Sequence, residues 1–129
     1  MMLSPAGHTA VVDRLLQEPN ININAEKKLK ETPLHIAAEH GYTACVSRFL
    51  EEPMIDINAK DMFKETPLHI AAEIGHTDCV TRFLEEPNID FNAVDRNKNT
   101  PLHCAVEWGH AEIVNRLLEQ PRLGLISML

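Results

Sequence analysis

One tetrapeptide occurs three times in this chain at a fixed interval. Thr-Pro-Leu-His begins at Thr32, at Thr66 and at Thr100, a step of 34 residues each time. Residues 31–60 and 65–94 are identical at 23 of 30 aligned positions. A period of this length is typical of proteins in which each unit buries its apolar faces only by stacking on its neighbours. The sequence therefore predicts a stack of repeats rather than one globular core.

The first part of each repeat carries the signals of a short helix. Threonine is a favoured N-cap and proline a favoured first helical residue, so a helix is expected to begin at each Thr-Pro pair. After Thr32, the apolar residues Leu34, Ala37 and Ala38 are spaced i, i+3, i+4 and form one face. Gly41 is expected to end this helix in a left-handed conformation.

A second helix and a loop complete the unit. Val46, Phe49 and Leu50 again have helical spacing, and Pro53 closes the helix because proline cannot continue one. The alternation at 55–57 predicts a short extended segment, and a turn is expected before the next helix. Other residues recur with the same step and are expected to hold the scaffold: Gly7, Gly41, Gly75 and Gly109 at helix ends, and Arg14, Arg48, Arg82 and Arg116.

The motif Thr-Pro-Leu-His-x-Ala, followed by glycine and then by Ile-Asp-Ile-Asn-Ala, resembles the ankyrin repeat. The resemblance covers about residues 6–122. It implies an all-α repeat solenoid, an elongated stack of helix-turn-helix units with short β-hairpin fingers. The expected organisation is a single domain over 1–129, with a partial repeat at 1–24 and full repeats at 25–58, 59–92 and 93–129, the last with a C-terminal tail.

The chain departs from the family pattern two residues before each repeated threonine. The family commonly has glycine there, whereas this chain has Lys30, Lys64 and Lys98. Two alternatives follow: each finger bends differently from the family pattern, or these lysines adopt a left-handed backbone conformation at a small energetic cost.

Composition and charge exclude several classes of function. A net charge of −7 argues against nucleic acid as the main partner. No apolar run is long enough to span a membrane, and residues 1–5 lack the pattern of a signal peptide. Three cysteines without a Cys-x-x-Cys pair favour a reducing, cytoplasmic setting, or the host cytosol for a secreted effector.

The seven histidines do not predict a metal site. His35, His69 and His103 recur within the signature, and each is expected to bond its own helix start or a neighbouring finger. Equivalent residues of stacked helices lie about 10 Å apart, whereas zinc ligands lie about 2 Å from the ion. We therefore expect no metal, no cofactor and no catalytic residue.

The cysteines and three asparagines also have structural interpretations. Cys45, Cys79 and Cys104 are expected to be small buried hydrophobes. Within the resemblance, one set of asparagines matches the residue that oxygenases hydroxylate in some ankyrin proteins; the alternative is that they bond the finger backbone. These are Asn24, Asn58 and Asn92.

Partners of ankyrin proteins usually dock on the concave face, built from finger tips and the ends of the first helices. Carried over to this sequence, the resemblance assigns partner binding to Leu29, His40, Met62, Phe63, Ile74, Arg96, Asn97 and Trp108. Trp108 is the only tryptophan, and tryptophan is enriched among binding hot spots. The alternative is that Trp108 covers the neighbouring finger.

The expected function is a non-catalytic protein–protein interaction module. Seven of the twelve basic residues lie in finger segments, which predicts a partner segment with acidic and apolar residues, although these lysines can equally serve solubility. The alternative is a regulatory ankyrin segment of a larger enzyme or secreted effector whose active part is not in this chain. A monomer is expected, with end-to-end self-association as an alternative because the tail 123–129 is apolar.

Overall fold

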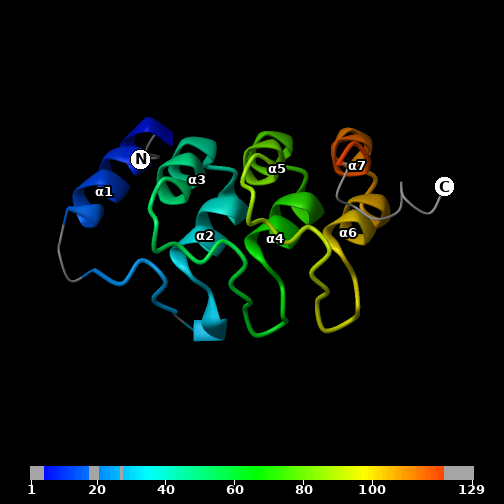
Figure 1. The fold of residues 1–129 in the computed structure, drawn as a ribbon, viewed down its shortest axis with the longest axis horizontal. Coiled ribbons are helices and arrows are strands. Elements are labelled where there is room, and N and C mark those ends of the chain that lie inside the picture. The colour runs from blue at the N-terminus through cyan, green and yellow to red at the C-terminus, as the bar shows by residue number, and fades with distance from the viewer. Residues whose placement is uncertain (1–4, 18–20, 27, 121–129) are drawn as a thin grey trace.

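Paired α-helices stack side by side along the long axis of the molecule (Figure 1). The computed structural model describes residues 5–17, 21–26 and 28–120. Its helices are α1 (Pro5–Leu16), the 3-10 helix η1 (Lys28–Lys30), α2 (Pro33–His40), α3 (Thr43–Leu50), α4 (Pro67–Ile74), α5 (Thr77–Leu84), α6 (Pro101–Glu107) and α7 (Ala111–Leu118).

The helices form two layers. The first helices α2, α4 and α6 pack on one another in one layer, and the second helices α1, α3, α5 and α7 form the other (Figure 1). Each first helix also packs against the second helix of its own unit. This all-helical repeat arrangement confirms the predicted fold class.

The first helices begin where the Thr-Pro pairs predict. The side chain of Thr32 accepts a hydrogen bond from the backbone N–H of His35 at 3.4 Å, and the N–H of Thr32 donates to Nδ1 of His35 at 3.1 Å. The same reciprocal pair forms at Thr66 and at Thr100. Because two otherwise unpaired amides are satisfied at each start, the helix boundary is fixed locally.

The predicted glycine helix ends are confirmed in the full repeats but not in the first. Gly41 has φ 72° and Gly75 has φ 102°, both left-handed. A Cβ atom on Gly41 would lie 2.6 Å from the ring of His76, so close packing also requires glycine there. Gly7 was expected at a helix end, and this prediction is wrong. Gly7 lies inside α1, a single helix from Pro5 to Leu16 that includes the positions occupied by the second helix in later units.

The fingers are closed turns rather than β-hairpins. The carboxylate of Asp61 accepts the N–H groups of Phe63 and Glu65 at 2.8 and 2.9 Å, and Asp95 makes the equivalent bonds in the next finger. Since a side chain satisfies these amides in place of a facing strand, no β-strand forms in the part of the chain that the structure describes. The short extended segment expected at 55–57 is likewise wrong, because a turn begins at Ile57.

The lysines that replace glycine in the fingers have a left-handed backbone, which is the second of the two alternatives expected for them. Their φ angles are 60° at Lys30, 61° at Lys64 and 65° at Lys98. Leu29 shares this conformation, with φ 71°, which the sequence did not predict. Adjacent fingers are joined by backbone bonds, from the N–H of Met62 to the carbonyl of Leu29 at 2.9 Å, with an equivalent bond one repeat later.

Buried histidines connect each unit to the next. Nε2 of His35 lies 2.9 Å from the carbonyl oxygen of Glu65, and Nε2 of His69 lies 2.8 Å from that of Asn99. Together with the bonds from Nδ1 to the helix start, these contacts confirm the structural interpretation of both histidines. The ring of His103 is exposed and bonds only its own helix start among the described residues.

The asparagine interpretation is confirmed for the first two members of the set. Asn24 donates from Nδ2 to the carbonyl of Met54 at 2.9 Å and accepts the N–H of Asp56 at 2.9 Å. Asn58 makes the same pair of bonds with the loop of the next unit. These side chains therefore hold the loops that follow the second helices.

One position of the repeat is buried in the last three units but exposed in the first unit, on α1. Leu117, Phe83 and Phe49 are 0, 0 and 7% exposed, whereas the equivalent Leu15 is 47% exposed. Leu15 lies on α1, whose flank is not covered by another helix in the described part of the chain. Burial in this fold is thus set by the presence of neighbours and not by residue type alone.

Candidate functional site: the concave groove

Three of the predicted binding residues line one hollow between the fingers and the ends of α2 and α4. They are Leu29, Phe63 and Ile74, which are 41, 40 and 45% exposed. Leu29 and Phe63 come from successive fingers, and Ile74 is the last residue of α4. The rest of the lining is mainly acidic and includes Glu31, Glu39, Asp61, Glu65 and Glu73.

Trp108 lies in an adjoining hollow. It follows directly after α6 and is 58% exposed, so most of its side chain faces solvent. The hollow is lined by Glu73, Ile74, Trp108 and His110. Glu73 and Ile74 belong to both hollows, which therefore adjoin each other, and we refer to the two hollows together as the concave groove.

The other four predicted binding residues line neither hollow. Met62 and Asn97 are exposed on finger turns. The ring of His40 stacks on Tyr42, with ring centroids 5.3 Å apart. The guanidinium of Arg96 lies 5.8 Å from the centre of the Phe63 ring, a cation–π distance, and so borders the groove.

A histidine at the start of each later second helix has a role that the sequence analysis did not find. Nε2 of His76 lies 2.9 Å from the carbonyl oxygen of Glu39, and Nε2 of His110 lies 2.8 Å from that of Glu73. These bonds satisfy carbonyls near the ends of first helices, beside the groove. The signal was the recurrence of histidine directly after the helix-ending glycine.

The structure has the architecture that the repeat motif implied. Helix pairs stack on one another, fingers join them, and the first helix of each full repeat begins at a capped Thr-Pro pair. A family model described as ankyrin repeats (3 copies) matches residues 1–61 and 53–124. The chain belongs to the ankyrin-repeat family. No curated protein matches it. Ankyrin-repeat domains generally bind proteins and are typically non-catalytic.

The ankyrin groove of this chain carries a row of carboxylates. Glu39, Glu73 and Glu107 occupy one position of the repeat near the ends of α2, α4 and α6, and Glu31 and Glu65 occupy another beside the fingers. The glutamates recur in phase in the sequence. Glu31, Glu39, Glu65 and Glu73 line the groove, whereas Glu107 lines neither hollow but helps to raise the pKa of Glu73. This placement was missed because the repeated motifs were interpreted as scaffold.

Burial and like charges act on two members of this row. The pKa of Glu65 is raised to about 7, first by burial and then by the negative charges of Asp61, Glu73 and Asp95. The pKa of Glu73 is also raised, first by burial and then by Glu107 and Asp95. Both glutamates are without an ion-pair partner in the described ranges. Glu65 is therefore about half protonated near pH 7, and no basic side chain neutralises the remaining charge of Glu65 and Glu73 in the described ranges.

This placement predicts a pH-dependent stability for Glu65→Gln. Between the ordinary pKa near 4.5 and the folded value of about 7, the folded state binds a proton that the unfolded state has lost. Wild-type stability therefore falls as pH rises through this window. Glutamine avoids that loss, so after allowance for solvent screening the variant should be more stable by about 1 kcal/mol at pH 8 and equal at pH 4.5.

Urea unfolding at the two pH values measures this difference. Glu85→Gln serves as the matched control, since Glu85 is 62% exposed and contacts Arg82 in the second-helix layer. A stabilisation by Glu65→Gln that is the same at both pH values would contradict the electrostatic origin.

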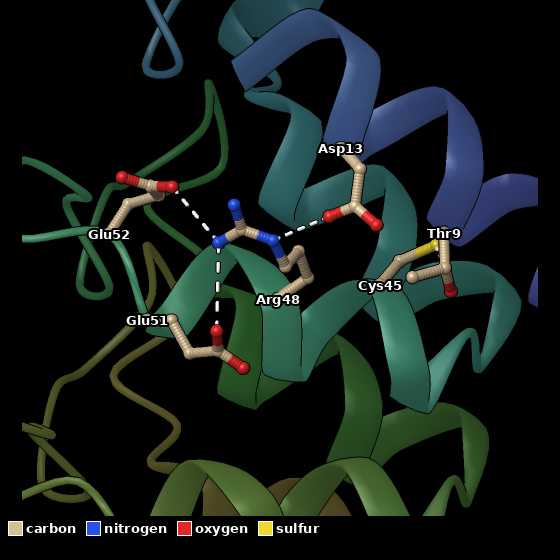
Figure 2. A network of polar contacts seen from close by, with 6 residues as sticks. All are labelled: Thr9, Asp13, Cys45, Arg48, Glu51 and Glu52. Carbon is tan, nitrogen blue, oxygen red and sulfur yellow. Dashed lines mark hydrogen bonds and ion pairs between the residues drawn. The ribbon is translucent and has the colours of Figure 1, made fainter. Parts of the chain in front are cut away.

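Several carboxylates of the second-helix layer are paired with arginine, in contrast to Glu65 and Glu73 of the groove. Figure 2 shows Arg48 between α1 and the end of α3, where Nε donates to Asp13 and Nη1 lies 2.9 Å from Glu52 and 3.7 Å from Glu51. Arg82 makes the equivalent 3.1 Å contact with Glu86. Arg48 therefore joins α1 to α3, and both arginines neutralise a glutamate that follows their own helix.

The thiols of the chain are not poised for nucleophilic chemistry. Cys45, Cys79 and Cys104 are free and buried, as predicted. Burial, followed by the nearby carboxylates, raises the pKa of Cys104 to about 12. A thiol with a raised pKa is protonated at neutral pH and reacts slowly.

The described ranges contain no group of three or more His, Cys, Asp or Glu residues that could hold a metal ion. They also contain no helix long and apolar enough to cross a membrane.

Proposed function

We propose that this chain is a non-catalytic module that binds a partner protein in the concave groove. The observation that carries the proposal is the convergence of exposed apolar side chains, Leu29, Phe63, Ile74 and Trp108, on one groove. Exposed apolar clusters of this kind mark interaction sites, and a large aromatic ring in such a cluster is a common hot spot.

The surroundings of the groove support this proposal. Arg96 borders the groove through its contact with Phe63, and we propose that the exposed His40, Met62 and Asn97 join it in a polar rim that orients a partner. The groove is built on capped helices and hydrogen-bonded turns, and a preformed surface lowers the ordering cost of association.

The setting proposed for this module is the reducing cytosol, or a host cytosol for a secreted effector, because its three buried thiols are unpaired. A monomer is proposed, with end-to-end association as the alternative. The tail at 123–129, on which that alternative rested, lies outside the described residues. The alternative function is a regulatory segment of a larger enzyme or effector, and a gene that continues into a catalytic region would favour it.

Affinity capture tests the binding function. Wild-type protein is compared with the triple variant Phe63→Ala/Ile74→Ala/Trp108→Ala, after equal helicity is established by circular dichroism. The matched control is Met54→Ala/Val11→Ala/Leu118→Ala, which removes three exposed apolar side chains outside the groove. We expect one protein to be retained by the wild type and the control, with retention by the groove variant reduced about tenfold or more. Equal retention by all three proteins would rule out the groove as the binding site.

A further inference from the structure

We propose that the concave groove receives a basic and apolar segment of its partner, with lysine or arginine side chains over the carboxylate row and apolar residues against Phe63 and Ile74. This inference rests on the proposed binding function and names the chemistry of the partner. It differs from the acidic and apolar segment that the finger lysines predicted, and the difference arises from where the charges lie in the fold.

The first argument is that the floor of the groove lacks counter-charge. Glu65 and Glu73 line the hollow together with Phe63 and Ile74. The charged groups that act on Glu65 are Asp61, Glu73 and Asp95, all carboxylates. Inserting an acidic segment would add a further like charge at this place, whereas a cation would relieve the repulsion.

The second argument is that the apolar walls suit the stems of basic side chains. Lysine and arginine bury their aliphatic stems along apolar surface while the charged head reaches a polar group. In this groove, Leu29, Phe63 and Ile74 stand beside the carboxylates of Glu65 and Glu73. A basic residue can therefore use both kinds of contact at once.

The third argument is the repetition of the charge. Glu39, Glu73 and Glu107 occupy equivalent positions on α2, α4 and α6, which pack against one another. Packed helices lie about 10 Å apart, and a polyproline II chain advances about 3.1 Å per residue with three residues per turn. The row therefore fits a segment in this conformation with a basic residue at every third position, since those side chains share one face.

The finger lysines do not compete for the same place. Lys30, Lys64 and Lys98 are exposed and stand on the finger turns. None of them is among the groups that shift the pKa of Glu65 or Glu73. The finger lysines are therefore set apart from Glu65 and Glu73, and Arg96, which contacts the Phe63 ring, is the basic residue at the border of the hollow. A segment that enters the hollow meets the carboxylates.

Fluorescence anisotropy with two synthetic peptides tests the proposal. One peptide has lysine at every third position with leucine and alanine between, and its twin has glutamate in place of each lysine. The groove variant is Glu65→Gln/Glu73→Gln. The control is Glu85→Gln/Glu112→Gln, which removes the same charge from carboxylates that are 62 and 66% exposed on the second-helix layer.

We expect the wild type to bind the basic peptide at least about tenfold more tightly than the acidic peptide, with a loss of about tenfold in the groove variant and less than about twofold in the control. Equal losses in the two variants would show attraction to net charge alone and overturn the proposal. So would tighter binding of the acidic peptide, or no binding of the basic one. Each of these failures leaves the proposed function standing if the Phe63→Ala/Ile74→Ala/Trp108→Ala variant still loses its captured partner.

Discussion

His69→Ala is expected to lower the free energy of unfolding by about 2–4 kcal/mol. The His69 ring is fully buried, with Nδ1 bonded to Thr66 and Nε2 2.8 Å from the carbonyl oxygen of Asn99. Alanine would leave a buried helix start and the end of the next finger without partners, and it would open a cavity the size of an imidazole ring. An unpaired buried polar group costs about 1–3 kcal/mol, which sets the expected size of the effect.

His103→Ala is the matched control for this substitution. His103 forms the same bonds with Thr100 but is exposed, so water can replace the lost partners. Its loss should cost no more than a weakened helix cap, about 1 kcal/mol or less. Urea unfolding followed by circular dichroism compares the two variants. Equal destabilisation by both would show that the contact between units contributes nothing beyond the cap.

Leu117→Ala is expected to destabilise the protein by about 2–4 kcal/mol, and Leu15→Ala by less than about 1 kcal/mol. The two leucines occupy the same repeat position, but Leu117 on α7 is fully buried in the core whereas Leu15 on α1 is 47% exposed. Truncation inside the stack removes apolar burial and leaves a cavity, while truncation on the open flank removes only partial contact.

The midpoints of thermal and urea unfolding give this comparison directly, since residue type and repeat position are the same in both variants. If Leu15→Ala proved as costly as Leu117→Ala, the flank of α1 would have to be covered in solution. The unfolding midpoint would then be measured at several protein concentrations, because it rises with concentration only when a second copy covers the flank.

Local features of the fold were predictable because single residues determine them. The threonine and proline at each first helix specify a cap and a first turn, and Gly41 and Gly75 specify left-handed ends. The absence of glycine at Lys64 and Lys98 likewise indicated a left-handed backbone as one of two alternatives for these residues. None of these conclusions required knowledge of which unit lies beside which.

Features that depend on neighbouring units were predicted less well. The carboxylates of Glu65 and Glu73 become one charged floor only when two units stack, so their raised pKa values were not visible in the linear order. The fingers were expected as hairpins because the pattern does not show that Asp61 satisfies the turn amides. Gly7 was misplaced because its phase was considered without the helix around it.

Four of the contacts between units share one separation along the chain. Asn24 to Met54, His35 to Glu65, Asn58 to Asn88 and His69 to Asn99 each join residues 30 apart. A gene that gained or lost one whole period of 34 codons would keep the partners of every such contact in register, whereas an insertion of another length between partners would separate them. The fold therefore permits the chain to gain or lose whole repeats during evolution. Each such step would lengthen or shorten the groove by one carboxylate and one finger.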